Sequence, residues 1–221
     1  MKTQADKIPK GHFAMVLRLC VIMLLTSSFA IAQENGEEYF DDEQPLPEYV
    51  RPDMKVFTSL RAAQLNPDSA FILVLKGKKL KQFPREVYDL PNLLVLDLSK
   101  NKLKSLPEDI GRMSQLVELD LTGNKLKALP SSIGEFTEMK RLALNRNLVS
   151  ELPAEIGQMN ELEILELWDN ELVDLPPEIS DLKKLKILEL RGILFNKDDH
   201  DRFHEYLPDT RIYLSPPCNC N

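Results

Sequence analysis

The sequence has little of the material from which metal centres, thiol chemistry and phosphate-binding loops are built. Among 221 residues there are three Cys, three His and eight Gly, and aromatic residues make up only 7%. It contains no Gly-rich phosphate-binding motif and no nucleophile paired with a base. Basic residues are in deficit, with 28 Lys and Arg against 35 Asp and Glu and a net charge of −7. This balance argues against nucleic acid or anionic lipid as the main partner.

Leucine is the residue in excess, and it is concentrated in one part of the chain. Of 38 Leu, 28 lie between residues 70 and 190, where the sequence repeats every 23 residues from Ala70 onwards. The fourth and sixth positions of all six units are Leu. The ninth position of the four inner units is Asn: Asn101, Asn124, Asn147 and Asn170. Each of the first five units also contains a proline, followed three residues later by Val or Ile. A period of this length is the signature of a repeat architecture.

The repeat predicts its own local structure. Leu at alternate positions marks a short strand with one buried face, and a short crossover between units makes successive strands parallel. Each repeated Asn can bond backbone groups of its own and of the neighbouring turn, so we expect a structural Asn ladder. Proline fixes φ on the outer side, where too few residues remain for a full helix. No unit can bury its apolar edge alone, so stability must come from stacking.

The consensus LxxLxLxxNxLxxLPxxIGxLxx resembles that of leucine-rich repeat proteins. It is most similar to the 23-residue LPxxIG class of Ras-suppressor-like scaffolds and plant Ras-group repeat proteins, over residues 70 to 214. The resemblance implies an α/β fold: a curved leucine-rich repeat solenoid with a parallel β-sheet on its concave face and helical caps at both ends. This class is familiar from cytosolic scaffolds, whereas residues 1–32 have the pattern of an exported protein.

Six segments follow from these patterns. They are a signal peptide (1–32), an acidic Pro-containing linker (33–53), an N-terminal cap (54–69), leucine-rich repeats (70–192), a C-terminal cap (193–214) and a Cys-containing tail (215–221). In the caps we expect a helix from Thr58 to Leu65 with Thr58 as N-cap, a helix over Asp198–Leu207 and a strand over Arg211–Leu214. For Cys218 and Cys220 the options are an unstructured tail, a strained disulfide, an intermolecular disulfide or a weak thiolate metal site.

Residues 1–32 follow the order of a secretory signal, with bases, then an apolar stretch, then small residues at Ala30 and Ala32 for cleavage after Ala32. We therefore expect export to the periplasm, the medium or the cell surface. An uncleaved segment would instead anchor the protein in a membrane, although its apolar run is shorter than the roughly 20 residues of a spanning helix. Between Gln33 and Glu48 there are seven acids and no base, which is typical of a solvated, extended linker.

A partner-binding surface is predicted on the concave face, from residues that alternate with the buried leucines. The fourth unit contributes a basic group between acidic neighbours, and the only Trp, Trp168, stands beside it. A Trp flanked by Arg has the composition of an interface hot spot. Alternatively, Trp168 packs on the sheet and the charges form neutral cross-strand pairs. The predicted partner-binding residues are Asp97, Glu118, Asp120, Lys140, Arg141, Asn145, Arg146, Glu166, Trp168, Asp169 and Glu189.

We therefore expect a monomeric, non-catalytic scaffold that binds a protein or peptide, without a nucleic acid, small-molecule substrate, cofactor or metal. One rival is a structural envelope protein without a specific ligand. Another is a metal-dependent hydrolase using His200 and His204, spaced i, i+4, although the residues between them lack the Glu of zinc proteases. Asp97 and Asp120 stand at equivalent places on adjacent strands, but a glycosidase would also need a substrate cleft.

Overall fold

A computed structural model describes residues 49–51 and 53–218. The predicted signal peptide, the acidic stretch up to Glu48 and Cys220 lie outside the described residues. The chain divides into two compact units, Met1–Val56 and Phe57–Asn221.

In the described part of the first unit, the chain makes a local turn. The Met54 amide donates to the Arg51 carbonyl at 3.1 Å, and Arg51 Nε lies 3.8 Å from Asp53 Oδ1. Both charged side chains are exposed, so this ion pair contributes little stability.

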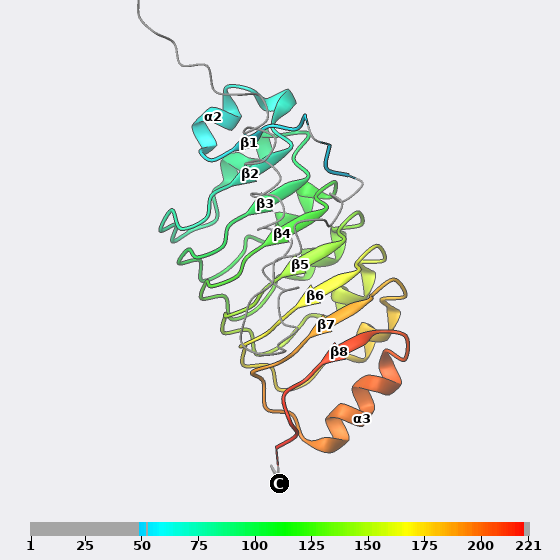
Figure 1. Ribbon diagram of the computed structural model, residues 1–221. Helices are drawn as coiled ribbons and strands as arrows, with labels where there is room; N and C mark the ends of the chain where they lie inside the picture. Colours follow the sequence, from blue (N-terminus) through cyan, green and yellow to red (C-terminus); the bar gives the residue numbers. More distant parts are fainter. Residues whose placement is uncertain (1–48, 52, 219–221) are drawn as a thin grey trace, which may run out of the picture. The chain divides into compact units, whose positions relative to one another are not determined.

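Eight strands form one sheet whose spatial order follows the chain (Figure 1). Every neighbouring pair from β2 to β8 is parallel, as predicted. From β2 to β7 each residue faces the one 23 positions further along, as with Ile72 and Val95, whereas Ile187 faces Arg211. The strands are β1 (Val56–Phe57), β2 (Ile72–Val74), β3 (Val95–Asp97), β4 (Glu118–Asp120), β5 (Arg141–Ala143), β6 (Ile164–Glu166), β7 (Ile187–Glu189) and β8 (Arg211–Tyr213).

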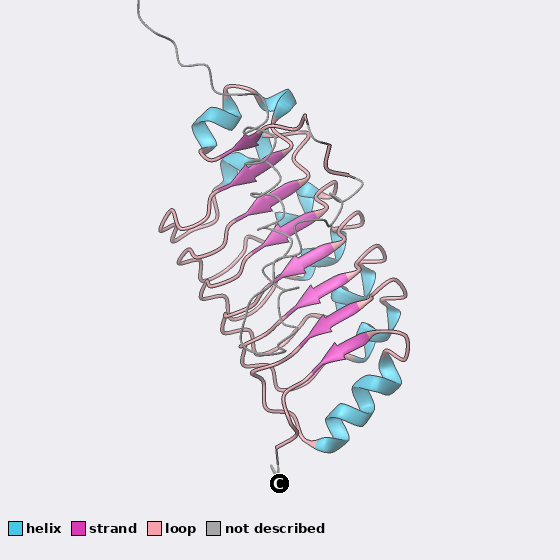
Figure 2. Cartoon of the chain, viewed as in Figure 1, coloured by secondary structure: helices cyan, strands magenta, loops and turns pink. Residues whose placement is uncertain are grey.

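In each of the first five units a short 3₁₀ helix follows the repeated proline (helices in Figure 2), and no full α-helix forms there, as predicted. Proline itself is the N-cap residue of four of them, and Asp109 is that of the fifth. The Val or Ile three residues after each proline is fully buried. The 3₁₀ helices are η1 (Pro67–Ser69), η2 (Arg85–Asp89), η3 (Ile110–Met113), η4 (Ser131–Glu135), η5 (Ala154–Gln158) and η6 (Pro177–Asp181).

Leucines of the fourth and sixth positions form a continuous core along the array. Each of the twelve is between 0% and 4% exposed. Few aromatic rings are needed, because the layer between the strands and the 3₁₀ helices is thin enough for aliphatic side chains to fill. Burying a Leu side chain contributes about 1.5–3 kcal/mol, so the array depends on every unit having neighbours.

The repeated asparagines form a ladder of hydrogen bonds in the turns that follow the strands. Asn124 is typical, because its Nδ2 donates to the carbonyls of Leu98 (3.0 Å) and Leu121 (2.8 Å). Its Oδ1 accepts from the Leu103 amide at 3.0 Å. One side chain thus satisfies backbone groups of its own unit and of the unit before it, which a tight buried turn would otherwise leave unpaired.

Helix α2 (Leu60–Gln64) precedes the repeats and is shorter than predicted. Its N-cap is Ser59, whose hydroxyl accepts from the Ala62 amide at 3.2 Å. The assignment of the N-cap to Thr58 is therefore wrong, since Ser59 has the extended backbone of a cap and presents its oxygen one residue closer to the first turn.

Helix α3 (Lys197–Tyr206) follows the last unit and begins one residue earlier than predicted. Asn196 caps it in a reciprocal box with Asp199, each side chain accepting from the other residue's amide at 3.0 Å. Phe203 is buried and packs edge-to-face on Phe195, with 4.9 Å between ring centroids.

In the tail, the Cys218 amide donates to the Phe195 carbonyl at 2.9 Å. Cys218 is disulfide-bonded, and the other two cysteines lie outside the described residues. Within residues 49–51 and 53–218, no helix combines the length and apolarity that crossing a bilayer requires.

Candidate functional site

The structure divides the eleven predicted partner-binding residues into a buried and an exposed set. Lys140 and Trp168 are half-buried, and Arg146 and Asp169 are exposed. The other seven are at most 6% exposed: Asp97, Glu118, Asp120, Arg141, Asn145, Glu166 and Glu189. Parallel strands place equivalent side chains about 5 Å apart, so long polar groups help to cover one another. Solvent-accessible contacts at the predicted site therefore come from four residues.

A buried ion pair joins β5 to β6. Arg141 Nε donates to Glu166 Oε1 at 2.9 Å, and Arg141 Nη2 lies 2.8 Å from the same oxygen. The second carboxylate oxygen accepts from Asn145 Nδ2 at 2.6 Å. Burial lowers the pKa of Arg141, but the carboxylates of Glu166 and Asp120 outweigh it and raise the pKa above its ordinary value. The guanidinium therefore stays charged inside the sheet and holds the two strands in register.

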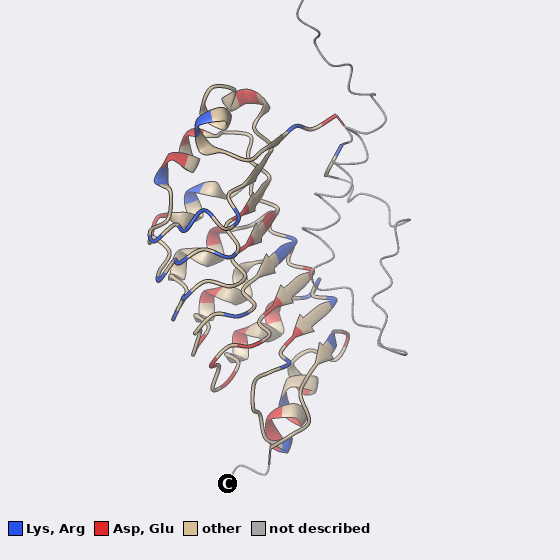
Figure 3. Ribbon diagram, turned by 60° about the vertical axis from the view of Figure 1, so that its left-hand side comes forward, with Lys and Arg blue, Asp and Glu red and all other residues tan. Residues whose placement is uncertain are grey.

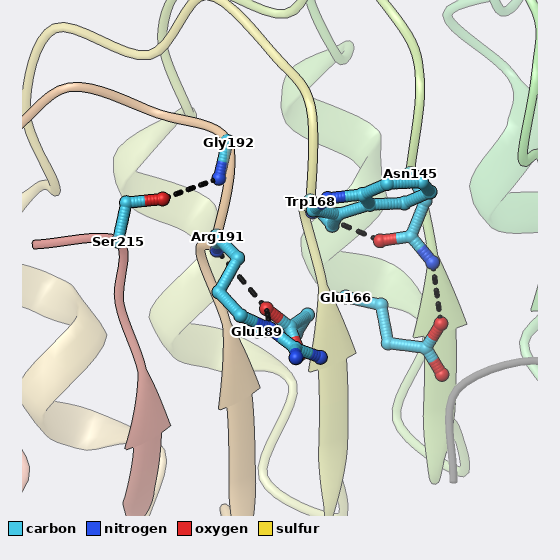
Figure 4. Close-up of polar contacts among 7 residues, drawn as sticks. All are labelled: Asn145, Glu166, Trp168, Glu189, Arg191, Gly192 and Ser215. Atoms are coloured by element: carbon cyan, nitrogen blue, oxygen red, sulfur yellow. Dashed lines mark hydrogen bonds and ion pairs between the residues drawn. The ribbon is translucent and has the colours of Figure 1, made fainter. Parts of the chain in front are cut away.

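Trp168 follows β6 and rests on this network (Figure 4). Its backbone amide donates to Asn145 Oδ1 at 2.9 Å, so the amide of Asn145 links Trp168 to Glu166. The guanidinium carbon of Arg146 lies 4.3 Å from the centroid of the Trp168 ring, a cation–π contact. We call Arg141, Asn145, Arg146, Glu166 and Trp168 the Trp168 platform. It presents a half-buried indole and an exposed guanidinium on a buried polar support.

A second arginine, outside the predicted set, is held in the same way on the next strand. Arg191 Nε donates to Glu189 Oε1 at 2.8 Å, and its guanidinium carbon lies 5.3 Å from the Tyr213 ring centroid (Figure 4 shows the Arg191–Glu189 pair). The hydrogen bond to Glu189 raises the pKa of Arg191. Arg191 occupies the same repeat position as Trp168, so its alignment with Trp168 was a signal in the sequence. The sequence carried no such signal for Tyr213, because the last unit is one residue longer and Tyr213 therefore falls outside the 23-residue alignment.

The eighth position of every unit has a left-handed backbone, with φ between 55° and 76°. The six residues are Gly77, Lys100, Gly123, Arg146, Asp169 and Gly192. Glycine adopts this conformation freely, whereas other residues lose about 1–2 kcal/mol. Three glycines at one position of the repeat were the sequence signal for this turn, and sequence reasoning missed it. Arg146 and Asp169 hold this strained conformation next to Trp168.

An open hollow of about 510 Å³ adjoins the platform on the edge formed by these turns. It lies between the basic Lys125 and Arg146 and the acidic Asp169 and Glu171, so it offers both signs of charge within one concavity. Its lining is Asn124, Lys125, Arg146, Asn147, Leu148, Asp169, Asn170 and Glu171.

The acidic pair on the sheet, Asp97 and Asp120, caps backbone turns. Asp97 faces Asp120 across β3 and β4, and each carboxylate caps its own turn, accepting from the amides of Ser99 (2.7 Å) and Thr122 (2.8 Å). Burial raises the pKa of Asp97, and the nearby Asp120 raises it further. On α3, His200 is half-buried and His204 is exposed. Within the described residues, no three His, Cys, Asp or Glu side chains are grouped so that they could hold a metal ion.

Stacked parallel strands, a leucine core and an asparagine ladder define a leucine-rich repeat fold, and comparisons with known proteins agree. A family model described as leucine rich repeat matches residues 72–126. A leucine-rich repeat protein of Leptospira interrogans has a similar structure, with 31% identity and a TM-score of 0.61, covering 74% of this chain and 49% of that one. Internalin C2 of Listeria monocytogenes is similar in fold, with 19% identity and a TM-score of 0.58, covering 72% and 66%.

The chain thus spans about half of the Leptospira protein's chain and just under two thirds of the internalin chain. No curated protein matches the sequence significantly. The chain therefore has a leucine-rich repeat fold, and its architecture is that of a repeat scaffold, a type that generally binds other proteins.

Proposed function

We propose that this protein is a non-catalytic scaffold that binds a protein or peptide through the Trp168 platform. The observation that carries the proposal is the stack of exposed Arg146 on half-buried Trp168, held from beneath by the buried Arg141–Glu166 pair. Trp and Arg are enriched among the residues that dominate binding energy at interfaces. A platform already held in place loses little conformational entropy when a partner binds, which favours affinity.

The surroundings of the platform favour a peptide-sized partner. The hollow beside it has basic residues on one side and acidic residues on the other, so a segment carrying both charges can pair with each. The hollow is open along the edge and does not enclose a small molecule, which sites for small ligands usually do.

Export is the second part of the proposal and rests on the signal-like order of residues 1–32. We assign the repeat itself to the 23-residue LPxxIG class, because the first five units carry the proline and four of them carry Ile three residues later, with Val87 in the first. N-terminal sequencing of the protein isolated from its host tests the export claim: a first residue of Gln33 supports it, and a chain that begins at Met1 contradicts it. In the latter case, fractionation then distinguishes an anchored protein from one that never left the cell.

Affinity capture from the native compartment tests the binding claim. The full-length protein is compared with Trp168→Ala/Arg146→Glu, which removes the indole and reverses the charge stacked on it. We expect the captured partner to be lost from the double variant. Lys100→Glu is the matched control, since Lys100 is exposed, occupies the same repeat position as Arg146 and has the same φ of 55°.

Thermal melting of each variant establishes that the fold survives. A partner captured equally by wild type and by the folded double variant would contradict binding through the platform. Absence of any specific partner from wild type would instead support a purely structural envelope role.

A further inference from the structure

Exposed lysines are concentrated in the turns that follow β2, β3 and β4. We call eight of them the lysine edge: Lys78, Lys79, Lys81, Lys100, Lys102, Lys104, Lys125 and Lys127. All eight are exposed, and the turns they occupy (75–82, 98–106 and 121–129) contain no acidic residue. Figure 3 shows these basic turns along one side of the sheet. A chain with a net charge of −7 thus presents a strongly basic edge.

The repeat arranges most of these lysines in two rows. Lys79, Lys102 and Lys125 occupy the tenth position of successive units, and Lys81, Lys104 and Lys127 occupy the twelfth. The turns are bonded to one another, because the Lys102 amide donates to the Leu80 carbonyl at 2.7 Å and the Lys125 amide to the Leu103 carbonyl at 2.8 Å. Neighbouring lysines of a row therefore start from backbones about 5 Å apart, the spacing of adjacent strands.

Nothing in the described part of the chain neutralises these charges. None of the eight lysines forms an ion pair with a carboxylate of a described residue. Like charges at this spacing repel each other, and Lys79 and Lys100 also hold left-handed backbones with φ of 61° and 55°. Both features disfavour the folded state. An external anion that binds the rows would account for their retention.

Further along the same edge the exposed charged residues are acidic instead of basic, which limits the size of the ligand. Asp169, Glu171 and Asp174 are exposed in the turn of the fifth unit, two repeats beyond Lys125. Two repeats correspond to about 10 Å, which is close to the distance over which charges still interact at physiological salt. A flat anionic membrane in contact with the lysines would also meet these carboxylates. A narrow, linear anion confined to the first three units would not.

The residue types indicate which anion fits. The three turns contain no aromatic side chain on which a nucleobase could stack and no Arg to read a base edge. The absence of Arg also disfavours a ligand rich in carboxylates, which Arg binds in a bidentate manner. Lys binds phosphate and sulfate as a point charge. We propose that the lysine edge binds a linear anionic polysaccharide through its sulfate or phosphate groups. This site shares no residue with the Trp168 platform, although Lys125 also lines the hollow beside the platform.

Binding of a fluorescently labelled heparin oligosaccharide to the full-length protein tests the proposal. We compare wild type with Lys79→Gln/Lys81→Gln/Lys102→Gln/Lys104→Gln, which leaves the hollow beside the Trp168 platform intact. The control variant removes four exposed positive charges elsewhere: Arg61→Gln/Lys183→Gln/Lys197→Gln/Arg211→Gln. We expect the first variant to bind at least about tenfold more weakly and with a shallower salt dependence, and the control to stay within about twofold of wild type.

No binding by wild type, or an equal loss in both variants, overturns the proposal. A single-stranded oligonucleotide, poly-glutamate or vesicles of phosphatidylglycerol that bind as tightly through the same lysines overturn the assignment to a polysaccharide. If circular dichroism shows that the quadruple variant does not fold, Lys102→Gln/Lys104→Gln is used instead. This double variant should change log Kd for heparin by about half as much as expected for the quadruple variant. Capture of the protein partner by the quadruple variant should be unchanged, so the two sites are tested independently.

Discussion

The asparagine ladder predicts that neighbouring Asn residues are energetically coupled. The Leu98 carbonyl accepts from both Asn101 (2.8 Å) and Asn124 (3.0 Å), and the Leu121 carbonyl accepts from both Asn124 (2.8 Å) and Asn147 (3.0 Å). Each inner carbonyl therefore has two donors, one from its own unit and one from the next. In Asn124→Ala, both carbonyls keep one hydrogen bond each.

The single substitution nevertheless leaves the Leu103 amide without its partner, because Asn124 Oδ1 is the acceptor for that buried donor. One orphaned amide and two weakened carbonyls together correspond to a loss of about 2–4 kcal/mol in the free energy of unfolding. In Asn124→Ala/Asn147→Ala the Leu121 carbonyl loses both donors. The double variant should therefore lose about 1–2 kcal/mol more than the sum of the two single variants.

Asn101→Ala/Asn147→Ala is the matched control pair. Asn101 donates to the Leu75 and Leu98 carbonyls, and Asn147 donates mainly to those of Leu121 and Leu144, so the two share no carbonyl. Their effects should add to within about 0.5 kcal/mol. Urea unfolding of the full-length protein, followed by circular dichroism, supplies all the free energies. Additivity in both pairs, or equal coupling in both, would refute the shared-carbonyl account.

Three further predictions follow from other parts of the fold. Gly192→Ala should lower Tm more than Gly77→Ala in calorimetry, because both backbones are left-handed but only the Cβ at Gly192 would meet backbone atoms, at 3.2 Å; equal shifts would contradict this. Glu166→Ala should lose about 3–5 kcal/mol in urea unfolding, because it leaves the buried Arg141 without its carboxylate; a loss below about 1 kcal/mol would count against the pair. Burial, and then Asp120, raise the pKa of Asp97 above its ordinary 3.8. The folded state therefore binds this proton more tightly than the unfolded chain and loses stability as pH rises from about 3.8 towards the raised value. Asp97→Asn should thus be more stable than wild type at pH 7 but not at about pH 3, and urea titrations at the two pH values that show no such difference would contradict the assignment.

The repeat positions decided how much of the fold could be predicted. Leu96 and Leu98 recur at fixed offsets, so their burial, the parallel strands and the spacing of the turns all follow from one alignment. The same alignment placed Asn101 in a buried turn, because only a backbone-bonding side chain suits that position. The ends of the repeat array were harder to predict. Thr58 and Ser59 are both good N-caps in sequence, and only the local backbone decides between them.

The candidate site was less predictable, for a physical reason. Alternation along a strand shows which face Glu166 and Glu189 point to, but not how much water reaches them. Their exposure depends on neighbours from units about 23 residues away, such as Arg141 over Glu166. The cation–π pair of Arg146 and Trp168 likewise depends on a left-handed φ at Arg146, which the glycines of the same repeat position indicate only indirectly.

In this chain the consensus positions build the fold, and the departures from consensus point to function. Stability in a repeat array is close to a sum over units and their interfaces, so a turn residue that contacts neither core nor ladder can vary at little cost. Lys100 and Arg146 are such residues, yet both occupy a strained position that Gly123 fills without strain. Replacing Lys100 by Gly should relieve that strain and affect anion binding only, whereas replacing Arg146 by Gly should relieve it and affect only the captured protein partner. If both substitutions stabilise the protein and each impairs only its own ligand, the strain at this position is retained for binding, at two sites on one scaffold.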